Sequence, residues 1–439
     1  MSRYPEYKDS EYEWLGEVPE HWDVIAFKHC ASIESSLVDP QLPEHIGRTL
    51  IAPNHVESGT GRILAEETAG DQGADSGKYL YHQGAVVYSK IRPALAKACI
   101  PREGGLCSAD MYPLTPRSDV DSRFLLYVLI SDFFTDQAVL ASERVAMPKV
   151  NRETLNDFRI ARPPLAEQRQ LAAYLDRKTA EVDTLIQKKQ ALIARLGELR
   201  AALIHRAVTK GLDPDVPMKA SGVEWLGEVP EHWTIPQLKY TTQFVNGAAF
   251  KPAEWVSDGI PIIRISNLNG DPVFNHSAEE VAEKYHVREG DLLFAWSGNR
   301  GTSFGPFLWA REGLYYLNQH IFRLKGYEYD TRYFYWMLKT VTTHVEEQAH
   351  GIIGMVHITK GDLGAIRVPE MPKAEQLEIA RYLDETTGQI DSIVEREGKL
   401  IELLRELRTS LISEVVTGKV DVRAEPLAPE AAPLPTVIA

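Results

Sequence analysis

Hydrophobic side chains recur at alternating three- and four-residue steps in two stretches of this chain. Six of the seven positions in each stretch are apolar, and the seventh is Lys189 in the first stretch and Glu397 in the second. The apolar positions are Val182, Leu185, Leu192, Leu196, Leu199 and Leu203, and then Ile390, Ile393, Leu400, Leu404, Leu407 and Leu411. Such a stripe is typical of a coiled-coil helix. We therefore predict two helices of roughly 40 residues, each roughly 60 Å long.

A helix with one apolar stripe must bury it, and the nearest available partner is the other helix. Lys189 and Glu397 are equivalent at an offset of 208 residues and lie near the middle of each stretch. In an antiparallel pair they would face each other, and a buried pair of opposite charges can fix register and orientation. The alternative, that both are solvated at a local break, stays equally open. We predict an antiparallel coiled coil.

The chain contains an internal repeat. The ten residues from Glu13 to Trp22 and from Glu224 to Trp233 both read EWLGEVPEHW, and a second shared motif begins at Ala166 and at Ala374. We call EWLGEVPEHW the ten-residue repeat. The predicted domains are an N-terminal motif (1–22), a globular part (23–162), a helical region (163–222), the second motif (223–233), a second globular part (234–368), a second helical region (369–420) and a Pro- and Ala-rich disordered tail (421–439).

Both globular parts have the pattern of mixed α/β structure. Runs typical of strands lie at 84–91, 261–268 and 290–296, and helical runs lie at 122–134 and 331–341. Gly84–Tyr88 matches Gly290–Phe294, and Met147–Val150 matches Met355–Ile358, but little is shared between these landmarks. The fold class is therefore α+β. The repeat kept its helices alike while its globular parts diverged, which suits one framework carrying two different readers.

The formal net charge of −14 argues at first against nucleic acid as a partner. However, residues 20–162 carry 15 Lys and Arg against 19 Asp and Glu, and residues 231–368 carry 13 against 15. A nearly neutral domain can still present a basic face. The three cysteines form no CxxC pair, no apolar run is long enough to cross a bilayer, and the N-terminus lacks a signal peptide's apolar core. We expect a reducing cytoplasm and no membrane partner.

Polar side chains suited to reading DNA gather in the loops of both globular parts. Arg and Lys suit guanine and phosphates, whereas Asn and Gln suit adenine. Taken singly, polar loop residues are usually just solvated, so we interpret them as groups. The candidate DNA-binding residues are Ser89, Lys90, Arg92, Lys97 and Lys149 in the first part, and Arg264, Ser297, Asn299, Arg300, Asn318, Gln319, His320 and Lys360 in the second.

The sequence holds no motif for catalysis. GxxxxGK[ST], the (N/D)PP(Y/F) tetrapeptide of amino-methyltransferases, the dinucleotide fingerprint, HExxH and GxSxG are all absent, and the thirteen histidines form no metal-spaced cluster. His21 and His232 precede Trp22 and Trp233 in the ten-residue repeats. A paired structural role fits these histidines better than catalysis does. We predict no catalytic, cofactor-binding or metal-binding residue in this chain.

The ten-residue repeat, PPLAEQRQLAAYLD and PKAEQLEIARYLD at the helix starts, IRISNL, and LIAPNHVESGTGRIL together resemble the specificity subunit of bacterial Type I restriction-modification enzymes. The resemblance implies that the globular parts are target recognition domains, one for each half-site of double-stranded DNA. It implies that two modification (methyltransferase) subunits dock on the helices and ten-residue repeats, and that two restriction subunits complete the complex. S-adenosylmethionine, ATP and Mg²⁺ would bind those partners, and no cofactor would bind this chain.

Two readings compete with this one. A stand-alone DNA methyltransferase would need the tetrapeptide that is missing here. A scaffold that gathers partners through its coiled coil without touching DNA would need no sequence preference. If the chain reads DNA, its two unlike readers predict an asymmetric, bipartite site, with an unread spacer that depends on helix length.

Overall fold

A computed structural model describes residues 3–142, 148–348 and 354–424 of the chain. The chain divides into two compact units, one formed by residues 1–190 with 398–439 and the other by residues 191–397. Each unit therefore holds one globular domain and half of each long helix. The predicted tail lies outside the described residues from 425 onward, as does Met147.

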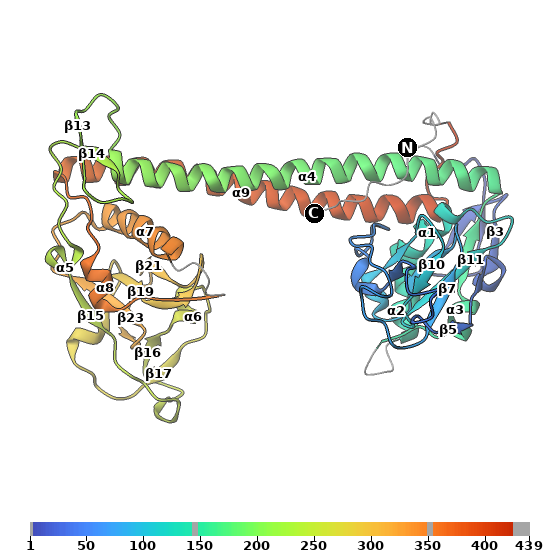
Figure 1. Ribbon diagram of the computed structural model, residues 1–439, viewed down its shortest axis with the longest axis horizontal. Helices are drawn as coiled ribbons and strands as arrows, with labels where there is room; N and C mark the ends of the chain where they lie inside the picture. The colour runs from blue at the N-terminus through green and yellow to red at the C-terminus, as the bar shows by residue number, and fades with distance from the viewer. Residues whose placement is uncertain (1–2, 143–147, 349–353, 425–439) are drawn as a thin grey trace. The chain divides into compact units, whose positions relative to one another are not determined.

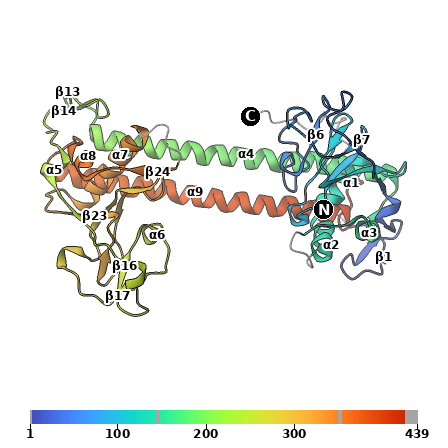
Figure 2. The ribbon, with the colours of Figure 1, turned by 60° about the horizontal axis from the view of Figure 1, so that its bottom comes forward.

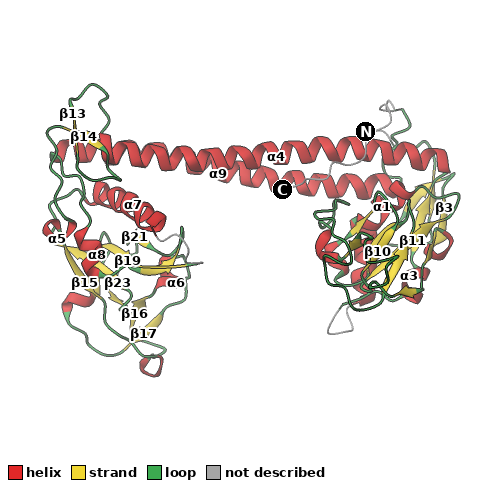
Figure 3. Ribbon diagram, in the orientation of Figure 1, coloured by secondary structure: helices red, strands yellow, loops and turns green. Residues whose placement is uncertain are grey.

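The two long helices are α4 (Leu165–Lys210) and α9 (Lys373–Val416), shown in Figure 1 and in red in Figure 3. They confirm the two predicted helices, at 46 and 44 residues. Prolines explain where they begin, because proline is tolerated only in the first turn of a helix. Pro163 and Pro164 precede α4, and Pro372 precedes α9.

The two helices run antiparallel within each unit. In the first unit, residues 171–175 of α4 share a hydrophobic core with residues 411–416 of α9, and further along α4 Asp183 binds Arg408. In the second unit, Arg200 binds Asp391, and residues 204–208 share a core with residues 379–383. Residue numbers rise along α4 as they fall along α9, so the predicted antiparallel arrangement is confirmed in each unit.

Two equivalent ion pairs link α4 to α9. Asp183 lies 3.0 Å from Arg408 in the first unit, and Arg200 lies 3.1 Å from Asp391 in the second. The offset of 208 residues carries Asp183 onto Asp391 and Arg200 onto Arg408. The repeat thus places the same Arg–Asp ion pair in both units. These ion pairs favour one register of α4 against α9.

The predicted pair of Lys189 and Glu397 is divided between the two units, Lys189 in the first and Glu397 in the second. Their pairing stays a prediction. Exchanging the two charges singly and then together tests it, and a double exchange that recovers no stability would contradict it.

Part of the predicted apolar stripe is wrong, because several of its leucines face solvent. Buried instead are Ile186, Ile204 and Ile401, each 9% exposed or less. Apolar residues at neighbouring positions make the stripe wider than two packed helices can cover. We call six exposed leucines the exposed leucine rows: Leu185, Leu192 and Leu199 on α4, and Leu400, Leu403 and Leu407 on α9, all 37–60% exposed. Of these, only Leu403 lies outside the predicted stripe.

Each long helix contains a glycine well inside it, Gly197 in α4 and Gly398 in α9. A methyl group added at either would meet no heavy atom within 4 Å. Glycine costs a helix about 1 kcal/mol relative to alanine. We expect Gly197→Ala and Gly398→Ala each to raise the free energy of unfolding by about that amount in urea titrations followed by circular dichroism. A loss of stability would show that the helices need these two flexible points.

The first globular domain contains two four-stranded sheets, in the orders β5-β7-β10-β6 and β4-β11-β8-β9. Its strands are β4 (Ala31–Ile33), β5 (Leu37–Val38), β6 (Leu50–Ile51), β7 (Lys78–Tyr81), β8 (Val86–Ser89), β9 (Ala98–Cys99), β10 (Gly105–Cys107) and β11 (Met111–Pro116). Strands β3 (Asp23–Ala26) and β12 (Arg159–Arg162) pair separately. Helix α1 (Ser122–Ile130) packs against β8 and β9, and Figure 2 shows the domain from a second side.

The second globular domain also has two four-stranded sheets, in the orders β15-β23-β19-β21 and β17-β16-β22-β18. Its strands are β15 (Gln243–Asn246), β16 (Ile260–Ile263), β17 (Asn275–Ser277), β18 (His286–Val287), β19 (Leu292–Ala295), β21 (Gly305–Leu308), β22 (Tyr315–Leu317) and β23 (Ile321–Lys325). A further two-stranded antiparallel sheet pairs β20 (Ser297–Asn299) with β24 (Met355–His357). Its helices are α5 (Leu238–Thr241), α6 (Ile265–Leu268), α7 (Thr331–Gln348) and α8 (Lys360–Ala365).

The two domains repeat one architecture with a local difference. In each, a central strand pairs parallel to one neighbour and antiparallel to the other: β10 with β6 and β7, and β22 with β16 and β18. The fourth strand differs, since β5 joins β7 whereas β17 joins β16. The α+β class and the internal repeat are confirmed. The run at 261–268, predicted as a strand, becomes a helix from Ile265 onward.

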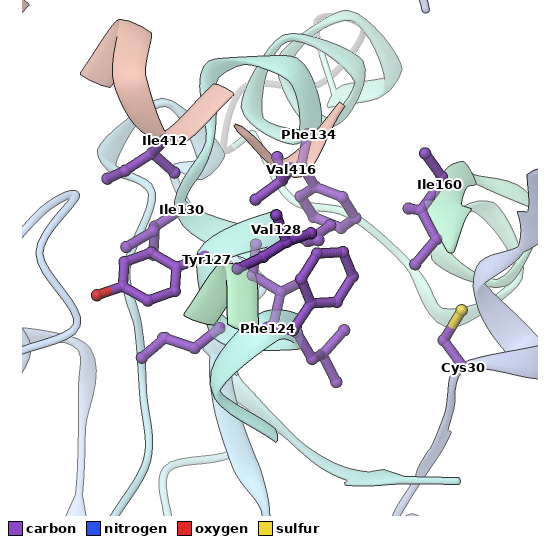
Figure 4. Close-up of a cluster of buried hydrophobic side chains, with 14 of the residues drawn as sticks. Cys30, Phe124, Tyr127, Val128, Ile130, Phe134, Ile160, Ile412 and Val416 are labelled. Carbon is purple, nitrogen blue, oxygen red and sulfur yellow. The ribbon is translucent and has the colours of Figure 1, made fainter. Parts of the chain in front are cut away.

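Helix α1 anchors the first domain to the helix pair. Its residues from Phe124 to Ile130 are all buried, and Figure 4 shows Phe124 and Val128 facing Val416 of α9. The predicted helical run at 122–134 breaks at Ser131, after which α2 (Asp132–Ser142) begins with a bend of 57°. No single described helix is long and apolar enough to cross a membrane, and only the bent pair α1 and α2 meets that test together.

The three cysteines are free and buried. Burial raises the pKa of Cys30 and of Cys99 to about 12. Their thiols therefore stay protonated at neutral pH and serve as small apolar groups in the core.

Candidate nucleic-acid interface

Each ten-residue repeat supplies the second strand of a hairpin, and the residues just before it supply the first strand. Strands β1 (Tyr7–Asp9) and β2 (Glu17–Pro19) pair in the first unit, and β13 (Met218–Ala220) and β14 (Glu228–Pro230) pair in the second. Each repeat ends in a buried tryptophan, Trp22 or Trp233, which is 0% exposed. Gly418 and Gly211 lie against these rings at the helix ends, where each glycine has a positive φ.

One glutamate in each helix start binds the ten-residue repeat. Glu167 accepts hydrogen bonds from the Trp22 indole at 3.2 Å and from Tyr4 at 2.7 Å, and it lies 2.8 Å from His21. Glu375 repeats the arrangement with the Trp233 indole at 2.9 Å and with the His232 ring at 2.7 Å. The histidines thus have the paired structural place that the sequence predicted.

The glutamine after each glutamate ties the helix start to the globular domain. The Gln168 side chain accepts a hydrogen bond from the backbone of Asp121, and Gln376 does the same with Asp330. Both aspartates cap the N-terminus of a domain helix, α1 or α7. The repeated Glu-Gln pair therefore connects the start of each long helix to the ten-residue repeat and the globular domain. We call this connection the joint.

A third repeated residue, the aspartate of the Tyr-Leu-Asp motif, lies about two turns further along the long helix and binds the same domain helix. Asp176 accepts from the Tyr127 hydroxyl at 2.8 Å, and Asp384 accepts from the Trp336 indole at 2.9 Å. Burial raises the pKa of Asp176 above its ordinary value, while the nearby Arg123 guanidinium opposes that rise. The equivalent aspartates thus accept a hydrogen bond from different aromatic side chains, a tyrosine in the first unit and a tryptophan in the second.

Replacing Glu167 or Glu375 with alanine is expected to lower the free energy of unfolding by different amounts in the two units. The Glu167 side chain is 8% exposed, and Glu375 is 33% exposed. Because Glu167→Ala leaves buried donors without an acceptor, we expect a loss of about 3 kcal/mol, against about 1 kcal/mol for Glu375→Ala. Urea unfolding followed by tryptophan fluorescence measures both. Equal losses would show that burial does not set the strength of the joint, and Glu167→Gln, which keeps one acceptor, serves as the control.

In the first domain, the candidate residues gather where β8 ends. Ser89 is the last residue of β8, and Lys90 and Arg92 follow it directly. Lys149 joins them from far along the chain, because its backbone bridges to Ile91. The side chains of Arg92 and Lys149 are exposed. Lys97 instead donates to the Pro53 carbonyl at 2.6 Å, which holds its own loop.

In the second domain, the candidates surround the equivalent strand end. Ser297 and Asn299 lie on β20, directly after β19, and Asn318, Gln319 and His320 lie between β22 and β23. Gln319 reaches this place through its carbonyl, which accepts from the Trp296 indole at 3.1 Å. The exposed side chains in this group are Asn299, Gln319 and His320.

Three basic candidates in the second domain are engaged with their own domain. Arg264 donates to the Asn275 side chain at 2.7 Å, and Lys360 donates to the Phe244 carbonyl at 2.8 Å. Arg300 is exposed, and its guanidinium donates to the Glu346 carbonyl. These bonds give the three residues a structural role, and a role at DNA stays a prediction.

The prediction missed residues that lie in the same clusters. Trp296 contacts the His320 ring at 5.2 Å and the His357 ring at 4.9 Å between centroids. In the first domain, Asp110 lies beside Lys90, which donates its backbone N–H to the Asp110 carbonyl. Position at a strand end marked Trp296 in the sequence, and the match of Met355–Ile358 with Met147–Val150 placed His357 opposite Lys149. Only the tertiary pairing of β20 with β24 shows that His357 contacts Trp296.

Among the residues that the structure describes, no group of three or more His, Cys, Asp or Glu side chains is arranged to hold a metal ion. The polar clusters of both domains are instead rich in donors and acceptors on loops, which suits recognition of base edges and phosphates.

Comparison with known proteins gives consistent similarities. The sequence model of the Type I restriction modification DNA specificity domain matches residues 47–195 and 230–403, more than half of the chain. The EcoDI specificity subunit of Escherichia coli is 34% identical over 193 residues, which span 44% of this chain and 43% of that protein. The putative MjaX specificity subunit of Methanocaldococcus jannaschii is 24% identical over 441 residues, or 95% of this chain and 98% of that protein.

Solved structures share the fold. A chain from a structure on complex assembly and conformational transition of the type I R-M system has a TM-score of 0.75 at 18% identity, covering 92% of this chain and 99% of that one. The HsdS subunit from Thermoanaerobacter tengcongensis has a TM-score of 0.57 at 18% identity, covering 94% and 100%.

Proposed function

Because this chain belongs to the family of Type I restriction-modification DNA specificity subunits, we propose that it reads an asymmetric, bipartite DNA site with one globular domain per half-site. The observation that carries this proposal is the repeated joint: Glu167, Gln168 and Asp176 in one unit, and their equivalents in the other, hold two different domains to the helix pair in the same way. Identical mounting with different loops is what two readers of unlike sequences require.

The exposed clusters at the ends of β8 and β19 supply the contacts in this proposal. Lys90, Arg92 and Lys149 bind phosphates and guanine, and Asn299 and Gln319 bind adenine. Direct contacts to phosphates release counterions, so affinity falls steeply with salt.

The experiment is a selection from random duplex DNA by the chain assembled with its modification subunits. We expect enrichment of two short half-sites separated by a constant, unselected spacer, and affinity that drops as salt rises from 50 to 200 mM, by about 10³-fold if six phosphates are contacted. A complex that assembles but selects no sequence would instead identify a scaffold, the second candidate function.

The exposed leucine rows are the proposed docking surface for two modification subunits. Leu185, Leu192 and Leu199 recur at seven-residue intervals, as do Leu400 and Leu407, and such a row can be covered by another helix. Large exposed apolar patches mark interaction sites. We propose Trp14 of the ten-residue repeat as a separate contact for these partners, since it is 46% exposed and packs on Phe133 at 5.1 Å. Methylation with S-adenosylmethionine belongs to these partners, and ATP- and Mg²⁺-dependent cleavage belongs to two restriction subunits. The complex acts on DNA in the cytoplasm, and this chain supplies no catalytic group.

Charging one leucine row tests this docking surface. We expect Leu192→Glu with Leu199→Glu to weaken binding of a modification subunit at least tenfold, because two apolar contacts worth about 1–2 kcal/mol each are lost. Native mass spectrometry measures the number of bound subunits. The side chains are already exposed, so circular dichroism should stay unchanged, and full binding by the variant would refute this docking surface.

A further inference from the structure

The two readers share one backbone frame at the strand end where the candidate residues gather. In the first domain, the Lys90 N–H donates to the Asp110 carbonyl at 3.0 Å, and the Lys90 carbonyl accepts from Val150 at 2.9 Å. In the second domain, the Trp296 N–H donates to the His320 carbonyl at 3.3 Å, and its carbonyl accepts from Ile358 at 3.0 Å. Lys90 and Trp296 therefore occupy equivalent positions, since each makes the same two backbone hydrogen bonds. We call this position the node.

The third member of each frame comes from the strand that crosses this node. Lys149 bridges to Ile91, and His357 pairs with Ser297, in each case one residue beyond the node. The equivalent positions are thus 90 and 296, 110 and 320, and 149 and 357. We call each set of three a reader triad.

Exposure and support are alike in both triads. Lys90 and Trp296 are half-buried, and the other four side chains are exposed. The Lys90 ammonium lies 5.3 Å above the Tyr112 ring, and the Trp296 ring stacks on Phe322 at 5.9 Å. Tyr112 pairs with Tyr88 and Phe322 with Phe294, at the same step of the equivalent strands. The first residue of each triad therefore packs on an aromatic ring at an equivalent strand position, Tyr112 or Phe322.

The side-chain chemistry of the two triads differs completely. The first triad is Lys, Asp and Lys, which offers two cationic donors beside one acceptor. The second triad is Trp, His and His, in which both histidine rings touch the indole. A frame kept at three positions while every side chain changes is the pattern expected of positions that set specificity.

Resting on the proposed function, we propose that the reader triads decide the base preference of the two half-sites. The first triad selects a G·C pair, because the lysines donate to guanine O6 and N7 and Asp110 accepts from the cytosine amine. The second triad selects an A·T pair, because the Trp296 ring packs on the thymine methyl group and the histidines bond to adenine.

The test is selection from random duplex DNA by the full complex with its modification subunits. The double variant Asp110→Ala with Lys149→Ala removes only exposed side chains, so it leaves the fold intact. We expect it to lower discrimination for a G·C pair in the first half-site by about tenfold or more and to leave the second half-site unchanged. His320→Ala with His357→Ala should do the reverse, which makes the two variants controls for each other.

Lys28→Ala is the matched control for lost charge, because Lys28 is exposed in the same domain on the short helix before β4. It should leave base preference unchanged in both half-sites. The inference is overturned if the triad variants keep the wild-type preference, or if either variant alters both half-sites. A wild-type complex that selects no sequence overturns the proposed function itself, so the two failures are distinguishable.

Discussion

Lengthening both helices by seven residues is expected to abolish recognition of the natural site and create a new site with the same half-sites and a longer spacer. Seven residues are about two helical turns and add about 10.5 Å to each helix. At about 3.4 Å per base pair, the spacer should grow by about three base pairs. The insertions belong after Gln190 in α4 and after Glu397 in α9, where the two units divide. A whole heptad keeps the apolar stripe in phase.

The measurement is again selection from random DNA, which reports half-sites and spacer separately. Insertion into α4 alone is the control, because it puts the two helices out of step and should lower stability without defining a new spacer. If the doubly lengthened protein still selects the original spacer, helix length does not set the separation of the half-sites.

The second large effect is expected from Arg408→Ala. The side chains of Arg408 and Asp183 are only 8% and 19% exposed, and Arg408 also donates to the Gly59 carbonyl of the first domain at 2.7 Å. Breaking a buried pair leaves the other charge without compensation, so we expect the free energy of unfolding to fall by about 3 kcal/mol. Urea unfolding of the full chain measures the loss.

The repeat supplies a matched control for this experiment. Arg200 and Asp391 form the equivalent pair but are 34% and 59% exposed. Exposed pairs contribute about 1 kcal/mol or less, so Arg200→Ala should have a small effect. Arg408→Lys keeps the charge but cannot reach both acceptors with a planar fork, and it should show an intermediate loss. Similar losses for Arg408→Ala and Arg200→Ala would mean that burial of the first pair contributes nothing.

Much of the architecture was predictable because it depends on periodicity and repetition along the chain. The apolar stripes predicted α4 and α9, and the repeated peptides predicted two equivalent halves. The mixed α/β character of both domains followed from short apolar runs between Gly-, Asn- and Ser-rich loops. These signals are local, so the sequence carries them without knowledge of packing.

The candidate site was predictable only in part. Lys90 and Asn299 lie next to strands that the sequence marks, so their clusters could be found. The joint formed by Glu167 with Trp22 spans 145 residues, and no local pattern reveals that the two meet. His357 is in the same position, since it reaches Trp296 only because β24 pairs with β20.

The sequence by itself determined that this protein is a duplication with two long helices and two unlike readers, because helix period and identical peptides are properties of the chain. The tertiary structure alone decided which face of each helix is buried, and it left Leu192 and Leu199 outside. It also pairs Asp183 with Arg408 between the two helices, and it brings the three residues of each reader triad together from separate segments of the chain. The buried helix faces, this ion pair and the triads all depend on contacts between residues far apart in the chain, and only tertiary packing brings such residues together.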